Sequence, residues 1–249
     1  MDSAAERFRL LSPADYVLWA ACVLLDALAV VCSVRSKSFR KYFVLNLYLI
    51  AAGALPIVSF AILRRFGFTS HEYFYFYFYS DAMLTTSLYF VLMSLYARVF
   101  EELNWSKYVR AGAMLVLGGT ALFSYRIVAG SGDRMLTHFV AELSQNLYFV
   151  GLVLTYVLWG AVMKLRETRT RIIQFVLSLG VYFSGLAATY ALCNIYPSFP
   201  LWQYVPPIFG VLLPTAWAYT FSQVSEDARL AVASVAVSRS LANPASEHR

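Results

Sequence analysis

A stripe of polar side chains runs along one helical face of the apolar segment 135–163. The stripe consists of His138, Glu142, Gln145 and Asn146. Their spacing of i, i+4, i+7 and i+8 is typical of one face of an α-helix. A carboxyl group near an imidazole can bind a polar ligand, hold two helices together, or serve as an acid and base in catalysis.

Two further charged residues stand at a similar depth in neighbouring apolar segments. Asp81 follows an aromatic stretch, and Arg126 ends the segment before the stripe. Ionisable groups inside apolar segments are costly and mark candidate functional sites. The ligand-binding hypothesis therefore comprises Asp81, Arg126, His138, Glu142, Asn146 and Tyr77. The alternative is a salt-bridged network that only fixes helix packing.

Asp26 is a second candidate, separate from the first. It lies nine residues before Arg35, or roughly 13 Å along a helix at 1.5 Å per residue, near the middle of its apolar segment. We expect its carboxyl group to carry a proton at neutral pH, since no Lys or Arg stands at this depth in another segment. By depth, its candidate partners are Asn46, Thr215 and Tyr219. The alternatives are an interhelical hydrogen bond and a role in proton carriage or ligand binding.

These residues must be positioned by apolar elements. The chain has 249 residues, of which 60% are hydrophobic and 14% charged, whereas a soluble domain has about 25% charged residues. Seven apolar stretches are long enough to cross a bilayer. They are residues 14–34, 42–63, 73–97, 108–129, 135–163, 172–196 and 204–224. The sequence therefore predicts an all-α, polytopic membrane protein with a single seven-helix transmembrane domain, 1–224, and a short tail, 225–249.

The distribution of basic residues predicts the orientation. Of the 20 Lys and Arg residues, 14 fall in the loops after the first, third and fifth stretches and in the C-terminal tail, and 6 fall on the other side. Basic residues concentrate in cytoplasmic loops. We therefore expect the N-terminus outside and the C-terminus in the cytoplasm. The net charge of +6 then reflects orientation, and no nucleic-acid partner is expected.

Residues 73–79 alternate Tyr and Phe with a period of two, a pattern typical of a strand. The run continues into an apolar segment without a turn signal, and an isolated strand cannot satisfy its backbone in lipid. We therefore predict a helix with an aromatic collar at the outer interface. The residues from Thr69 to Glu72 match a capping box at its start.

No cofactor is expected from the sequence. Retinal needs a Schiff-base lysine in the seventh helix, yet the lysines stand only at positions 37, 41, 107 and 164. Haem would have to use His71 and His138, and we consider it a minor alternative. Three cysteines within the apolar stretches are at no metal-binding spacing, and no metal site is predicted.

The third stretch resembles a known group of proteins. Its aromatic opening, the Ser80-Asp81-Ala82 sequence and the segment from Phe90 to Phe100 are similar to the third span of a family of bacterial, acidobacterial-type seven-helix membrane proteins. Ala97 replaces the second acidic residue of that span. The resemblance implies the seven-span layout and no activity. The layout is also similar to the seven-helix sensor regions that precede histidine kinases, without the kinase part.

Three functional hypotheses follow. The first is a non-enzymatic, sensor- or receptor-like protein or accessory subunit, with an outward-facing polar pocket between the third, fourth and fifth helices. The second is a proton-linked secondary transporter that uses Asp26. The third is an intramembrane enzyme. The expected location is the cell membrane, as a multi-pass protein of a bacterial inner membrane. The expected partners are the lipid bilayer, a small-molecule ligand, and a membrane protein or a second copy of the chain.

Overall fold

The computed structural model describes residues 13–67, 70–100, 106–128, 135–164, 169–196 and 205–225. These residues form seven α-helices and no β-strand. The helices are α2 (Pro13–Arg35), α3 (Phe43–Phe66), α4 (His71–Val99), α5 (Ser106–Val128), α6 (Met135–Lys164), α7 (Thr170–Ile195) and α8 (Val205–Gln223). The all-α prediction is confirmed, and each apolar stretch corresponds to one helix.

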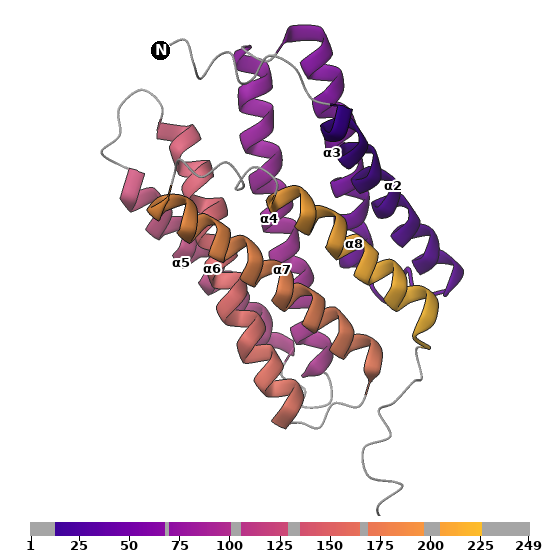
Figure 1. Cartoon of the computed structure of the whole chain (residues 1–249). Coiled ribbons are helices and arrows are strands. Elements are labelled where there is room, and N and C mark those ends of the chain that lie inside the picture. The colour runs from indigo at the N-terminus through magenta and orange to yellow at the C-terminus, as the bar shows by residue number, and fades with distance from the viewer. Residues whose placement is uncertain are drawn as a thin grey trace, which may run out of the picture.

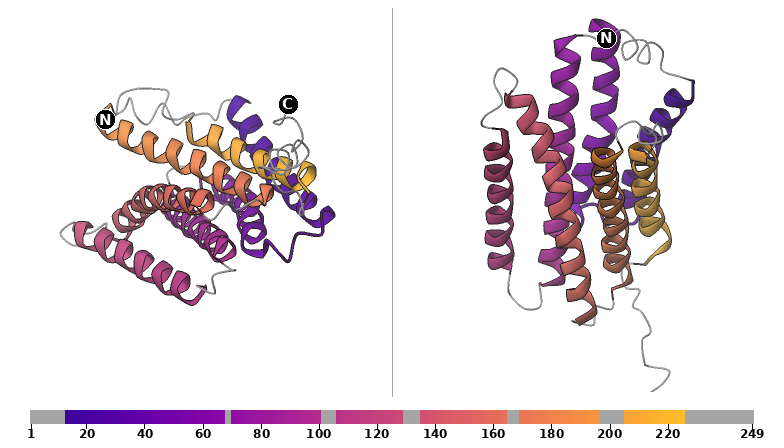
Figure 2. Two further views of the ribbon diagram at one scale, coloured as in Figure 1. Left: turned by 90° about the horizontal axis from the view of Figure 1, so that it is seen from below. Right: turned by 60° about the vertical axis from the view of Figure 1, so that its left-hand side comes forward.

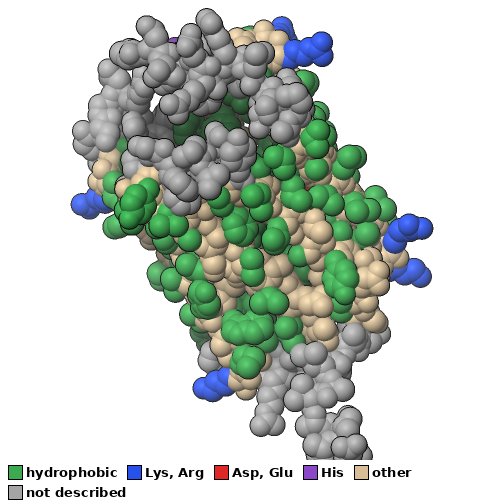
Figure 3. All heavy atoms as spheres, viewed as in Figure 1, with side chains coloured by type: hydrophobic (Ala, Val, Ile, Leu, Met, Phe, Trp, Pro, Cys, Tyr) green, Lys and Arg blue, Asp and Glu red, His purple; other side chains and the backbone are tan. Residues whose placement is uncertain are grey.

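Five of these helices, α2, α3, α4, α6 and α7, are long and apolar enough to cross a membrane. In α5, which has 23 residues, the described side chains include an apolar part over Met114–Val128. Hydrophobic side chains cover the middle of the face seen in Figure 3, while Lys and Arg lie at its margins. Such a surface is costly in water and favourable in lipid. The fold therefore supports a multi-pass membrane protein.

The aromatic stretch after position 72 is helical, as predicted from its context. It belongs to α4, and its rings stack along the helix, with 4.7 Å between the ring centres of Phe74 and Phe78. The helix begins at His71 because the side chain of Ser70 accepts a hydrogen bond from the backbone N–H of Tyr73 at 3.1 Å. The cap is thus Ser70 and not Thr69, which lies outside the described residues.

The helix α4 occupies the middle of the bundle (Figure 1). It packs against α3 and α6 and also contacts α5 and α7. On one side α2 packs against α3 and α8, and α8 packs against α7. The helix α5 lies at the edge, against α6 and α4 (Figure 2). Side chains of α4 can therefore meet residues from the other central helices.

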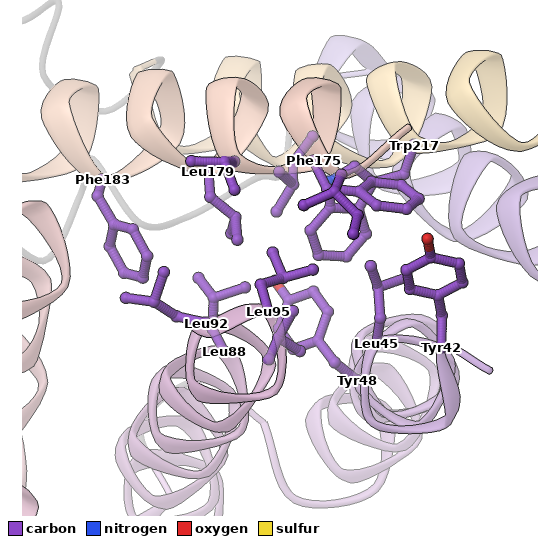
Figure 4. Close-up of a cluster of buried hydrophobic side chains, with 14 of the residues drawn as sticks. Tyr42, Leu45, Tyr48, Leu88, Leu92, Leu95, Phe175, Leu179, Phe183 and Trp217 are labelled. Atoms are coloured by element: carbon purple, nitrogen blue, oxygen red, sulfur yellow. The ribbon is translucent and has the colours of Figure 1, made fainter. Parts of the chain in front are cut away.

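The largest buried cluster joins α3, α4, α7 and α8 (Figure 4). The indole of Trp217 is fully buried there and donates a hydrogen bond to the hydroxyl of Ser178 at 2.8 Å. Gly151 of α6 lies directly against the ring of Phe183 in α7, because a Cβ at this position would come within 2.4 Å of the ring. The close approach of α6 and α7 places their polar side chains beside α4.

A buried arginine at the start of α7 connects three segments at that end of the bundle. Arg171, in the first turn of α7, is 3% exposed. Its guanidinium group donates hydrogen bonds to the hydroxyl of Ser38 at 2.6 Å and to the carbonyl of Val224 at 3.0 Å. These contacts connect the α2–α3 turn and the end of α8 to the start of α7.

Candidate functional site

Asp81 lies on α4 and is half-buried. Its carboxyl group interacts with the hydroxyl of Ser144 on α6, in a geometry outside the range of a standard hydrogen bond. Tyr77, one turn earlier on α4, also lies in electrostatic range of this carboxyl group. Tyr77 is 55% exposed, so the site extends from a buried carboxyl group toward the start of α4.

Four tyrosines surround Asp81 from the neighbouring helices. We call them the tyrosine cluster: Tyr48 of α3, Tyr148 of α6, and Tyr182 and Tyr190 of α7. Each of them lies in electrostatic range of the Asp81 carboxyl group. The rings of Tyr148 and Tyr190 stack, with 5.5 Å between their centres and 24° between their planes. Asp81 therefore sits beside aromatic side chains from three other helices.

Three hydroxyl groups of this cluster, those of Tyr48, Tyr182 and Tyr148, form a chain through the bundle. The hydroxyl of Tyr182 is within hydrogen-bonding reach of those of Tyr48 and Tyr148. The hydroxyl of Thr85 donates a hydrogen bond to the backbone carbonyl of Asp81 at 2.9 Å and lies 3.1 Å from the hydroxyl of Tyr148. Polar groups in an apolar interior need such partners. The chain fixes the orientation of the tyrosines.

Asp26 approaches the same cluster from the other side. Its side chain is 6% exposed, and its Cβ would lie 3.4 Å from a Cβ built on Gly53 of α3. Tyr48 and Tyr182 are in electrostatic range of both Asp26 and Asp81. The sequence predicts two separate sites for these acids, whereas in the fold both lie in electrostatic range of Tyr48 and Tyr182.

The partners expected for Asp26 are engaged elsewhere. The amide nitrogen of Asn46 donates hydrogen bonds to the carbonyls of Tyr42 at 2.8 Å and Phe39 at 3.3 Å. The hydroxyl of Thr215 donates to the carbonyl of Val211 within its own helix at 2.7 Å. Neither side chain is hydrogen-bonded to Asp26 in the described part of the chain. Asn46 supports the start of α3 instead.

The other predicted site residues are spread around α5 and α6. Arg126 is exposed and Glu142 is half-buried, and no ion pair joins Arg126 to Asp81 among the described residues. Asn146 donates a hydrogen bond to the hydroxyl of Ser124 at 3.0 Å, which connects α6 to α5. His138 lies on α6, and its side chain is outside the described residues. Among the described residues, the groups in electrostatic range of Asp81 therefore come from α3, α4, α6 and α7.

Sequence reasoning missed Ser144 and the tyrosine cluster. The signal for Ser144 and Tyr148 is their spacing of four residues, which places both on one face of α6. Tyr77, Asp81 and Thr85 repeat with the same spacing on α4. Tyrosines are frequent in this chain, 18 in all, so their number concealed the few that face Asp81.

A separate groove of about 470 Å³ runs between α6, α7 and α8. Small residues such as Gly180 and Ser184 line it together with Tyr156, Trp159 and Phe209. Within the described residues, no group of three or more His, Cys, Asp and Glu side chains is placed to hold a metal ion. Comparisons with protein families, with curated proteins and with solved structures return no match for this chain.

Proposed function

We propose that this chain is a seven-span protein of the cell membrane that works as a sensor or receptor and binds a small ligand around Asp81. In this proposal the N-terminus is outside and the C-terminus is cytoplasmic. The basic residues after the first, third and fifth helices support this orientation. The ends of α3 and α7 and the starts of α4, α6 and α8 then face outward.

One observation carries the proposal. Asp81 is an ionisable group in an apolar bundle, and side chains from three other helices converge on it without an ion pair in the described residues. Convergent polar groups within an apolar, aromatic lining are typical of ligand sites. We therefore place the proposed ligand site between α4, α6 and α7.

The contacts of α7 give the site a route to the cytoplasmic side. Tyr182 and Tyr190 of α7 face the site, and Arg171 at the other end of α7 holds the end of α8. A ligand that binds better to one arrangement of α7 shifts the population toward that arrangement. The C-terminal tail, which follows α8, would receive the change.

Access from outside can be measured by thiol labelling in intact cells. Cys22, Cys32 and Cys193 are first replaced by Ala, and Tyr77→Cys is introduced alone. A membrane-impermeant maleimide should label this variant in intact cells. The matched control is Lys37→Cys in the exposed α2–α3 turn, which should react only after permeabilisation. Labelling of Tyr77→Cys only after permeabilisation would contradict an outward-facing site.

A proton-linked carrier is the second candidate, favoured by Tyr48 and Tyr182, which lie in electrostatic range of both Asp26 and Asp81. Acids inside membrane spans are typical of proton relays in pumps and transporters. Proteoliposomes with a pH-sensitive dye inside should then acidify faster with the wild-type protein than with Asp26→Asn after external acidification. Equal rates for the two proteins would remove this candidate. A stable protein that co-purifies with the chain would favour an accessory subunit.

A further inference from the structure

Asp81 makes no ion pair among the described residues. Five tyrosines lie in electrostatic range of its carboxyl group: Tyr48, Tyr77, Tyr148, Tyr182 and Tyr190. The cation expected from the sequence, Arg126, is exposed and makes no ion pair with it in the described residues. A carboxyl group removed from water is stabilised by a cation. Without a cation such a carboxyl group takes up a proton, so a bound cation would hold Asp81 in its charged form.

The aromatic side chains near Asp81 suit a cation. The rings of Tyr148 and Tyr190 stack with 5.5 Å between their centres, and the ring centres of Tyr148 and Phe183 are 6.4 Å apart. Tyr182 and Phe183 meet nearly edge to face, at 78°. The faces of aromatic rings carry negative charge density and attract ammonium groups. The surroundings therefore select for positive charge and for apolar bulk together.

Ser144 supplies an independent observation. Its side chain is 2% exposed, and its hydroxyl has no hydrogen-bond partner in the described structure, although it interacts with the Asp81 carboxyl group. Buried hydroxyls are nearly always hydrogen-bonded. An N–H donor placed between Asp81 and Ser144 would satisfy both groups.

We propose that the site binds a small primary ammonium ion with an apolar substituent, held by Asp81, Ser144 and the rings of Tyr148 and Tyr190. This inference rests on the proposed function, since it names the ligand class of the same site. The N–H groups donate to the Asp81 carboxylate and the Ser144 hydroxyl, and the substituent contacts the rings. A divalent metal is a poorer fit, because Ca²⁺ and Mg²⁺ require about six oxygen ligands and several carboxylates or waters.

The test uses the full chain in lipid nanodiscs at pH 7, with 2-phenylethylammonium as the probe. Its neutral isostere is 2-phenylethanol, and sodium chloride serves as the simple cation. We expect a saturable rise in unfolding temperature with the ammonium ion only. Asp81→Asn should weaken binding by about tenfold or more, and Tyr190→Leu by about threefold or more, while Tyr190→Phe retains affinity within about twofold.

Ser144→Ala provides a second measure in case Asp81→Asn does not fold. It should lower the affinity by about threefold or more, while the matched control Ser124→Ala, a buried serine between α5 and α6, should not change it. Unchanged affinity in Ser144→Ala would overturn the inference. So would an equal response to 2-phenylethanol or to sodium chloride.

The failure of this inference differs from the failure of the proposed function. Binding of 2-phenylethanol that depends on Asp81 would refute an ammonium ligand and leave a ligand site in place. No response to the ammonium ion would also refute the ammonium ligand, while outside labelling of Tyr77→Cys would still support the open site. Loss of both the binding response and the outside labelling would refute the two proposals together.

Discussion

At the scale of single residues, Tyr148 connects most of the polar groups in the centre of the bundle. Its hydroxyl lies 3.1 Å from that of Thr85 and within reach of that of Tyr182, and its ring stacks on Tyr190. The ring and the hydroxyl therefore contribute separately. The ring packs α6 against α7, and the hydroxyl links both helices to α4.

Removing only the hydroxyl tests this division. Tyr148→Phe retains the ring, so it should destabilise the bundle by about 0.5–1.5 kcal/mol, the range of one interhelical hydrogen bond. The free energy of unfolding in mixed detergent micelles, measured by SDS titration, gives the value. Tyr156→Phe is the control, because Tyr156 is 64% exposed on the same helix. An equal loss in the two variants would contradict a structural role for the Tyr148 hydroxyl.

The site could be predicted from sequence only in part. Asp81 is conspicuous because acids are rare in apolar segments, and Tyr77 was included through the aromatic run beside it. The tyrosine cluster could not be found this way. Tyr48, Tyr148 and Tyr182 are far apart in the chain, and nothing in the apolar sequence around them distinguishes them from the exposed tyrosines. Which face of each helix points inward depends on helix packing, and residue spacing alone does not determine it.

At the scale of elements, the contact of α6 with α7 depends on Gly151. Gly151→Ala forces a Cβ to within 2.4 Å of the Phe183 ring, so the two helices must separate or the ring must turn. Overpacking of this kind costs about 1–3 kcal/mol. Unfolding by SDS titration should show this loss.

Gly160→Ala is the matched control on the same helix. No atom lies within 4 Å of a Cβ built at Gly160, and Ala favours a helix over Gly. This variant should therefore be as stable as the wild type or slightly more so. A similar loss in both variants would show that backbone effects, and not the contact with Phe183, determine the result.

The start of α7 depends on Arg171. In Arg171→Met the side-chain stem is retained, but the hydrogen bonds to Ser38 and Val224 are lost. Because buried partners are left unsatisfied, we expect a loss of about 2–4 kcal/mol. Unfolding measurements should show it, whereas Lys164→Met at an exposed position should be neutral. A neutral Arg171→Met would mean that α8 is held at its end by other contacts.

Helix positions were predictable for a physical reason that does not extend to their arrangement. A run of apolar residues must form a helix in lipid because its backbone has no other partners, so hydropathy located all seven. Their ends extend by up to three residues beyond the apolar stretches, as in α3, where Arg64 and Arg65 continue the helix past its apolar part. Neighbour relations, such as α2 beside α8, depend on side-chain complementarity between distant segments.

At the scale of the whole molecule, the number of crossings determines which surfaces face outward. Within the described residues, five helices meet the length and hydropathy of a span, and α5 and α8 are not among them. The helix α5 is peripheral, and α8 contains Pro214. Even so, α8 packs against α2 and α7, and α5 against α6, so both lie alongside helices of spanning length.

Reporter fusions on the two sides of α5 and α8 test the count directly. Alkaline phosphatase is active only outside the cytoplasm, so fusions at positions 103 and 166 should be inactive and fusions at 131 and 200 active if all seven helices cross. A fusion at position 230 should also be inactive, because a cytoplasmic C-terminus requires α8 to cross.

If α5 stays on one side, the fusions at 103 and 131 will have the same activity. The orientation of every later helix would then be reversed, including the end of α7 that carries Tyr190. Asp81 lies before α5, so its exposure to the outside would be unaffected. A ligand pocket shared with α6 and α7 requires α5 to cross, because only then does the start of α6 lie on the same side of the bilayer as the start of α4.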